Sequence, residues 1–151
     1  MDPLPLSTEY LFTMEIVVGV PQPVSDGLRV VPVLGGTVRG PALTGEVIDS
    51  ASADWLRMEA DGTAHMDVRF TIRAASGALV YVQYSGIRTG TPAVLARLGR
   101  GEAVSPAEYY FRVAIRFETG DATLAWMNRV LAVGVGQRPP SGPRYDVYAV
   151  R

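Results

Sequence analysis

Four ionisable side chains are the first candidates for chemistry in this sequence: Asp54, Arg69, Arg112 and Glu118. A carboxyl group held in an apolar cavity has a raised pKa, which suits it to accept and return a proton near neutral pH. A neighbouring arginine can bind a substrate carboxylate or enolate through two parallel hydrogen bonds. Together these residue types predict catalytic proton transfer in which developing oxyanion charge is stabilised.

Aromatic side chains could form the walls of the same site. The substrate-binding candidates are Trp55, Tyr84, Tyr110 and Trp126, with Asn128 as a further polar contact. Aromatic rings offer flat apolar area that suits a ring-containing ligand. Combined with the ionisable residues, they predict keto–enol isomerisation, cyclisation or lyase chemistry on an apolar, oxygenated small molecule.

Each candidate also has a structural interpretation. Arg69 and Arg112 alternate with apolar residues along their strands, so they point outwards if the apolar residues fill the interior. The sequence leaves both orientations open for these two arginines. Glu118 could anchor the turn that follows it, Trp126 could belong to the core, and Asn128 could satisfy backbone groups at a corner of the chain.

The composition excludes several other kinds of chemistry. The chain has no cysteine, so disulfides and thiolate nucleophiles are absent, and all 14 basic residues are arginine, so a lysine Schiff base is excluded. His65 is the single histidine, and no GxSxG motif accompanies it, so we expect no hydrolytic triad. We predict no metal site, because no spacing of carboxylates around His65 supports one. We also expect no cofactor, because the glycines lack the spacing of a phosphate-binding loop.

Charge and hydropathy narrow the range of partners. The formal net charge is -1 and no run of like charges occurs, which argues against nucleic acid or an anionic membrane as a partner. The N-terminal residues lack the basic start and apolar core of a signal peptide. No apolar run approaches the roughly 18 residues of a membrane-spanning helix. We therefore expect a cytoplasmic protein.

The elements that must position these residues are mostly strands. A chain of 151 residues fits one domain, here residues 1–151 with residues 1–8 as a loose N-terminal arm. A bend is predicted at Gly35–Gly36, and one short helix at 91–99, with Thr91 as its cap and Pro92 in its first turn. The predicted strands span residues 10–18, 28–34, 43–48, 63–74, 78–88, 109–118, 130–136 and 145–150.

The balance of elements predicts an all-β fold. With so little helix to cover a sheet, the sheet must bury its apolar face against itself, as in a closed barrel or a sandwich. Long strands joined by short hairpins favour a closed antiparallel barrel of about eight strands, which also removes unpaired edges.

A set of motifs along the chain resembles a known family. The chain from about Met14 onwards resembles the family of small β-barrel proteins called domain of unknown function 3237. The matching pieces are VVPVLGGTVRGPALTGEV at 30–47, ADW to DGTA at 53–64, Arg69, YFR at 110–112, FETG at 117–120 and WMNR at 126–129. The resemblance implies an allene-oxide-cyclase-like barrel, similar in shape to lipocalins, that encloses one small apolar ligand. Related barrels include cyclases and pericyclic enzymes of secondary metabolism, although one fold hosts many functions.

Three hypotheses for function follow. The first is a cofactor-independent isomerase, cyclase or lyase, which requires an open lumen of a few hundred Å³ with a carboxylate and an arginine facing inwards. The second is a non-catalytic ligand-binding barrel with an apolar lumen. The third is a structural, oligomerising protein whose lumen is filled by side chains. We expect a small-molecule ligand or substrate under the first two, and a homo-oligomer under all three.

Overall fold

Three consecutive strands show the alternating pattern of the sequence most clearly. In the computed structural model, which describes residues 1–151, they are β6 (Ala64–Ala74), β7 (Leu79–Gly90) and β8 (Tyr109–Thr119). In β8, every second side chain from Tyr109 is buried, and those between are exposed or half-buried. Because successive side chains of a strand point to opposite faces, each strand turns one apolar face to the interior.

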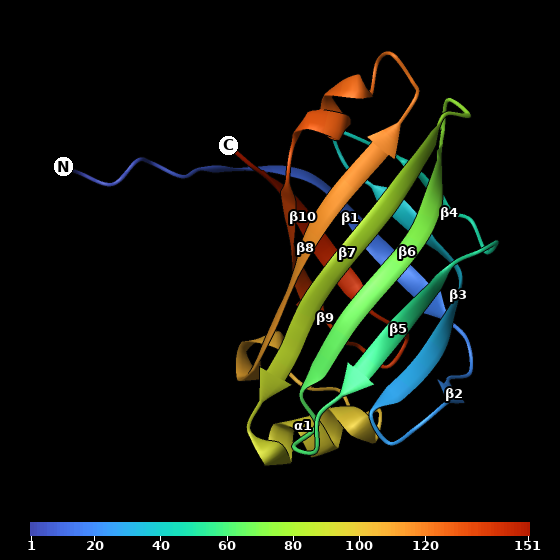
Figure 1. The fold of residues 1–151 in the computed structure, drawn as a ribbon, viewed down its shortest axis with the longest axis vertical. Helices are drawn as coiled ribbons and strands as arrows, with labels where there is room; N and C mark the ends of the chain where they lie inside the picture. The colour runs from blue at the N-terminus through green and yellow to red at the C-terminus, as the bar shows by residue number, and fades with distance from the viewer.

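Ten strands, one α-helix and two short 3₁₀ helices make up the fold (Figure 1). The other strands are β1 (Thr8–Val18), β2 (Gln22–Pro23), β3 (Leu28–Arg39), β4 (Gly45–Val47), β5 (Ala53–Met58), β9 (Ala132–Gln137) and β10 (Arg144–Val150). The helices are α1 (Pro92–Gly99), η1 (Pro106–Glu108) and η2 (Ala125–Arg129). The helix predicted at 91–99 is confirmed, and the Thr91 hydroxyl caps it by accepting a hydrogen bond from the Val94 N–H at 3.3 Å.

The sheet closes on itself because β1 pairs with both β10 and β3. From β1 the order runs through β10, β9, β8, β7 and β6, and then through β4 and β5 to β3. Strands β4 and β5 share one position, since each pairs with β3 on one side and β6 on the other. The ring therefore has eight positions, all paired antiparallel, and the predicted closed barrel is confirmed. Before β1, residues 1–6 are exposed and extend away from the barrel (Figure 1).

Strand β3 differs from its prediction. The sequence indicated a strand at 28–34 that ends in a bend at Gly35–Gly36, but β3 continues to Arg39. A side chain at Gly36 is impossible because its Cβ would lie 2.4 Å from the Glu15 carbonyl oxygen of β1. The glycine pair thus allows one long strand to pass close to β1 while it changes partner from β5 to β4.

The two ends of the barrel are covered differently. Figure 1 shows α1 beneath one end and η2 at the opposite end. Leu95 and Leu98 of α1 are buried against the barrel, and Met127 of η2 is fully buried. The eight-residue α1 is the longest helix, and none of the helices has the length and hydropathy needed to cross a bilayer.

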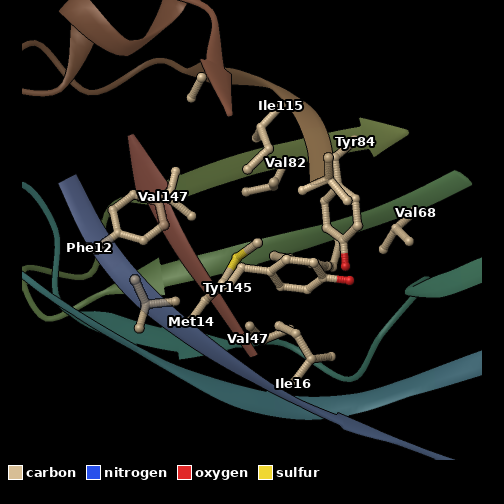
Figure 2. Close-up of a cluster of buried hydrophobic side chains, with 14 of the residues drawn as sticks. Phe12, Met14, Ile16, Val47, Val68, Val82, Tyr84, Ile115, Tyr145 and Val147 are labelled. Carbon is tan, nitrogen blue, oxygen red and sulfur yellow. The ribbon is translucent and has the colours of Figure 1, made fainter. Parts of the chain in front are cut away.

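Side chains fill the interior near η2. Phe12 and Met14 of β1 are fully buried there with Val147 of β10 (Figure 2). The rings of Phe12 and Phe117 meet edge to face with their centroids 6.0 Å apart. This part of the lumen is therefore a packed core.

Candidate functional site

A cavity of about 320 Å³ opens at the α1 end of the barrel. Its walls come from every position of the ring except that of β9, with Leu98 of α1 and residues that follow β1 and β9 at its mouth. Apolar walls are formed by side chains such as Val31, Leu56, Met66 and Phe111, and a small group of polar side chains reaches in among them. A cavity of this size that combines apolar walls with convergent polar groups has the character of a small-molecule site.

Asp54 is the carboxyl group of this cavity. It lies in β5 directly opposite Val31 of β3 and Val68 of β6, whose side chains are both buried, so its own side chain also faces inwards. Its Oδ1 accepts a hydrogen bond from the Asp67 backbone N–H at 3.0 Å. Burial raises the pKa of Asp54 to about 6. The hydrogen bond from Asp67 and the charge of Arg88 lower this pKa, but by less than burial raises it. A carboxyl group with this pKa changes charge near neutral pH, as a general acid or base requires.

Arg88 of β7 reaches the same cavity. Its guanidinium carbon lies 5.7 Å from the centroid of the Phe111 ring, and its Nε is buried without a hydrogen-bond partner. Burial is the main cause that lowers the pKa of Arg88 from its usual value, and repulsion from Arg138 is the next largest. Attraction to Asp54 opposes this lowering. Arg88 therefore places a largely desolvated positive charge near the carboxyl group.

Arg138 follows β9 and provides a second guanidinium at the cavity. Its backbone N–H donates to the Tyr109 hydroxyl at 2.8 Å, and its Nη1 donates to the Pro139 carbonyl oxygen at 2.7 Å. Burial lowers the pKa of Arg138, and the nearby Tyr145 and Tyr109 oppose this change. The hydrogen bonds hold the start of the loop after β9 in place, so the position of this arginine is well defined.

Tyr84 and Tyr145 form a buried pair beside the cavity. Their rings meet edge to face with centroids 5.3 Å apart, and their hydroxyl groups point towards one another (Figure 2). Burial is the main cause that raises the pKa of both phenols, so both remain protonated at neutral pH. Tyr145 lines the cavity itself, so it can offer a neutral O–H donor to a bound oxygen.

The structure brings only two of the predicted site residues to this cluster, Asp54 and Tyr84. Arg69, Arg112 and Glu118 project from the outer face of the barrel instead, so the prediction that they line the lumen with Asp54 is corrected. Each is directly preceded and followed along its strand by buried residues, so its own side chain points outwards.

The outer residues interact with one another at the surface. The Arg69 guanidinium lies 5.4 Å from the Trp55 ring and 3.6 Å from the Asp67 carboxylate. The Arg112 guanidinium lies 5.4 Å from the ring of Tyr110, which is also exposed. Trp55 and Tyr110 therefore pack against arginines outside the barrel and do not form walls of the cavity.

Trp126 and Asn128 lie in η2, at the end of the barrel away from the cavity. The Asn128 side chain accepts a hydrogen bond from the Thr119 N–H at 2.8 Å and donates one to the Thr119 carbonyl at 2.9 Å. Trp126 packs on the core, and the Arg151 guanidinium lies 5.9 Å from its ring. These contacts support the structural interpretation for both residues.

Sequence reasoning missed Arg88, Arg138 and Tyr145, although each lies in line with an alternating series. Tyr145 begins the inward series of β10, before Val147 and Ala149. Arg88 continues the inward series of β7, after Val80, Val82, Tyr84 and Gly86. Arg138 continues the inward series of β9, after Ala132, Gly134 and Gly136. Extension of each apolar series to the strand end would have found both arginines.

A larger hollow of about 490 Å³ lies against the outer face of β6, β7 and β8. Tyr110, Arg112 and His65 contribute to it, together with Ile87 and other apolar side chains. No carboxylate lines this outer hollow, so it lacks the combination of a carboxyl group and an arginine that Asp54 and Arg88 provide in the lumen.

Gly136 leaves room for the Phe111 ring in the cavity wall. A Cβ at this position would lie 2.5 Å from Cγ of Phe111. We expect Gly136→Ala to push the ring into the cavity, to lower the free energy of unfolding by about 1–3 kcal/mol, and to weaken ligand binding. Denaturant unfolding and ligand titration measure the two effects. Gly120→Ala is the control, since a Cβ there meets open space, and equal stability of the two variants would contradict the expected displacement.

Comparison with known proteins places the barrel among relatives of the same length. A family model described as "Protein of unknown function (DUF3237)" matches residues 6–150. A UPF0311 protein of Rhodopseudomonas palustris is 34% identical over 149 residues, which cover 96% of this chain and 97% of that protein. The crystal structure of a conserved protein of unknown function from the same species has a TM-score of 0.94 and 34% identity, with 100% of both chains covered.

Two further solved structures share the barrel. A β-barrel-like protein from Acinetobacter baumannii has a TM-score of 0.83 and 32% identity, with 99% of each chain covered. A protein from Penicillium herquei that is described as an enzyme has a TM-score of 0.73 and 23% identity, with 100% of this chain and 98% of that chain covered.

Proposed function

The chain belongs to the DUF3237 family, and we propose that it is a cofactor-independent enzyme that moves a proton on a small, largely apolar, oxygenated molecule held in the barrel lumen. The proposal rests on Asp54, a mostly buried carboxyl group with a pKa raised to about 6, which shares one cavity with Arg88, whose buried Nε has no hydrogen-bond partner. A carboxylate can remove a proton next to a carbonyl group, and a nearby cation can stabilise the enolate oxygen that forms.

The proposed reaction begins with the Asp54 carboxylate. It removes a proton from a carbon next to a carbonyl group, and the electron pair moves onto the carbonyl oxygen. Arg88 stabilises the resulting oxyanion electrostatically, and the neutral Tyr145 hydroxyl donates a hydrogen bond to it. Protonated Asp54 then returns the proton to another carbon of a conjugated enolate and gives an isomer. Alternatively, the enolate carbon attacks a second carbonyl carbon of the same molecule and closes a ring, and Asp54 protonates the new alkoxide. In a lyase reaction the enolate expels a leaving group from the β carbon, and Asp54 gives its proton to that group. Proton removal and return by a single carboxyl group needs no cofactor.

Comparison with the three hypotheses favours the enzyme. A ligand-binding barrel requires only apolar walls, and a structural protein requires a filled lumen. The cavity of about 320 Å³ and its charged groups support the first hypothesis instead. The enzyme from Penicillium herquei adds that a barrel of this shape can hold an active site. We further propose that the reaction is an isomerisation, a cyclisation or a lyase reaction, and that it belongs to secondary metabolism.

A reaction that needs only a carboxylate base can test the proposal before the natural substrate is found. With 5-nitrobenzisoxazole, the base removes the C3 proton, a C≡N bond forms, and the N–O bond breaks to release a coloured phenolate. We expect kcat/KM to rise with pH, to reach half its maximum near pH 6 and to level off at higher pH, because only ionised Asp54 can act as the base. Absorbance of the phenolate measures the rate at each pH.

Glu46→Gln is the control for this experiment. Glu46 is an exposed carboxylate on β4 outside the lumen, so its removal should leave the rate and the pH profile unchanged. A rate no higher than that of acetate at equal concentration, or a profile with its midpoint near the usual carboxyl pKa of about 4, would refute an activated carboxyl group in the lumen.

A further inference from the structure

The cavity holds more positive charge than its own residues can balance. Three arginines line it, namely Arg88, Arg138 and, at its exposed rim, Arg29, whereas Asp54 is its only carboxyl group. No ion pair of the chain within 4.0 Å involves any of these three arginines. Five other arginines of the chain form such pairs, for example Arg97 with Glu108 at 3.2 Å and Arg151 with Glu9 at 2.8 Å.

This imbalance is costly for folding. A buried guanidinium without a carboxylate loses hydration, which is replaced only in part here, by the Phe111 ring beside Arg88 and by the Pro139 carbonyl that accepts from Arg138. The buried Nε of Arg88 has no hydrogen-bond partner at all, which is uncommon for a buried donor. Repulsion between Arg88 and Arg138 adds to the cost. A destabilising cluster of this kind is expected where a ligand supplies the missing charge.

The chemistry of the cluster indicates the kind of ligand. Guanidinium groups bind planar oxyanions through parallel N–H donors, and a carboxylate matches this geometry. The other walls of the cavity, which include Val31, Leu56 and Phe111, are apolar and offer ring and aliphatic surface. The cluster therefore suits a molecule with one charged end and one apolar body.

We propose that the lumen binds an organic carboxylate with an apolar ring body, whose carboxylate group lies between Arg88 and Arg138. This inference rests on the proposed function, since it names the class of molecule that Asp54 acts on. Arg88 and Arg138 hold the carboxylate end, the apolar walls hold the ring, and Asp54 faces the part of the molecule next to the carboxylate. Arg29 at the rim attracts the anion towards the mouth of the cavity.

Matched acids and amides test the charge requirement. Benzoate, 1-naphthoate and cyclohexanecarboxylate are titrated calorimetrically into the full-length protein, each beside its neutral primary amide of nearly the same shape. We expect at least one acid to bind roughly tenfold or more tightly than its amide, because a charge-assisted hydrogen bond contributes at least that factor. Arg88→Met and Arg138→Met should each remove most of this preference.

Thermal unfolding of the same variants checks that they fold. We expect Arg88→Met to melt at a higher temperature than the wild type, since it replaces an unpaired buried charge by an apolar side chain. Arg116→Met is the matched control: Arg116 is exposed on the outer face of β8, so its replacement should preserve the preference for acids.

The outcomes separate this inference from the proposed function. Equal affinity for acids and amides, no binding of any acid in the panel, or a preference that survives in both Arg88→Met and Arg138→Met would each overturn the carboxylate ligand. The proton-transfer proposal would stand in those cases if the neutral benzisoxazole still reacts. A clear preference for acids without any benzisoxazole turnover would support the carboxylate site and refute the proposed enzyme.

Discussion

Asp54→Asn is expected to reduce the benzisoxazole reaction roughly 10²–10⁴-fold, the usual contribution of a positioned general base. The amide has nearly the shape of the carboxyl group and can still accept the hydrogen bond from the Asp67 N–H. It cannot accept a proton from the substrate. The change therefore removes the base and leaves the cavity and its backbone contact in place.

The same variant should be more stable than the wild type at neutral pH. The pKa of Asp54 is about 6 in the folded protein and 3.8 is its ordinary value. Below about pH 4 the Asp54 carboxyl group is protonated in both the folded and the unfolded state, so its ionisation does not lower the free energy of unfolding. Between about pH 4 and about pH 6 the unfolded chain loses the proton first, so the free energy of unfolding falls as pH rises, by about 3 kcal/mol in total. Asparagine does not ionise, so Asp54→Asn avoids this loss.

Activity and stability measured together provide the check. Denaturant unfolding of both proteins at about pH 4 and about pH 7 should show a gain for Asp54→Asn only at the higher pH. Glu46→Gln, which removes an exposed carboxylate, should change neither the activity nor the pH dependence of stability. If Asp54→Asn kept full activity, or gained no stability at neutral pH, Asp54 would not be the buried base.

Phe12→Ala is expected to cause the largest loss of stability, about 3–5 kcal/mol. Phe12 is fully buried in the filled half of the lumen, and its ring packs edge to face against Phe117. Removal of the ring leaves a void that neighbouring strands cannot fill, because the closed ring of hydrogen bonds resists collapse. Denaturant unfolding measures the change.

Tyr110→Ala is the matched aromatic control for Phe12→Ala. Tyr110 is 52% exposed on the outer face of β8 and contacts Arg112. Its replacement should cost no more than about 1 kcal/mol and should not affect ligand binding in the lumen. A cost as large as that of Phe12→Ala would mean that Tyr110 is covered, for example by a second copy of the chain.

Local patterns in the sequence determined most of the strands and the class of fold, although β5 was not predicted and β3 is longer than expected. Alternation in β6, β7 and β8 follows from the two-residue period of a strand, so it can be read without knowledge of any partner strand. The cap at Thr91 and the short helix after it are local in the same way. The scarcity of helix then leaves closure as the way to bury the apolar faces, and the eight-position barrel has this form.

The residues of the candidate site were predicted from the sequence less well than the fold. Tyr84 lies in a strand with a clear alternating pattern, whereas Asp54 lies in β5, which was not among the predicted strands. Arg69 and Arg112 were catalytic candidates because they are charged residues in otherwise apolar strands. The structure shows that their neighbours along each strand face inwards, so both arginines face outwards. Arg88 and Arg138 follow the same alternation in the opposite sense: Arg88 lies near the end of β7 and Arg138 directly after β9, both in phase with the inward-facing residues.

What the sequence by itself determined is which residues alternate and, from the lack of helices, that the sheet must enclose its own core. Only the tertiary structure decided that Asp54, Arg88, Arg138 and Tyr145 meet in one cavity. These residues come from different strands, and they meet because pairing of β1 with β10 and β3 closes the ring. The packing of Phe12 and Met14 near η2 also decided which end remains open. Closure of the ring and packing near η2 both depend on contacts between residues far apart in the sequence, so no short segment of the chain can predict them.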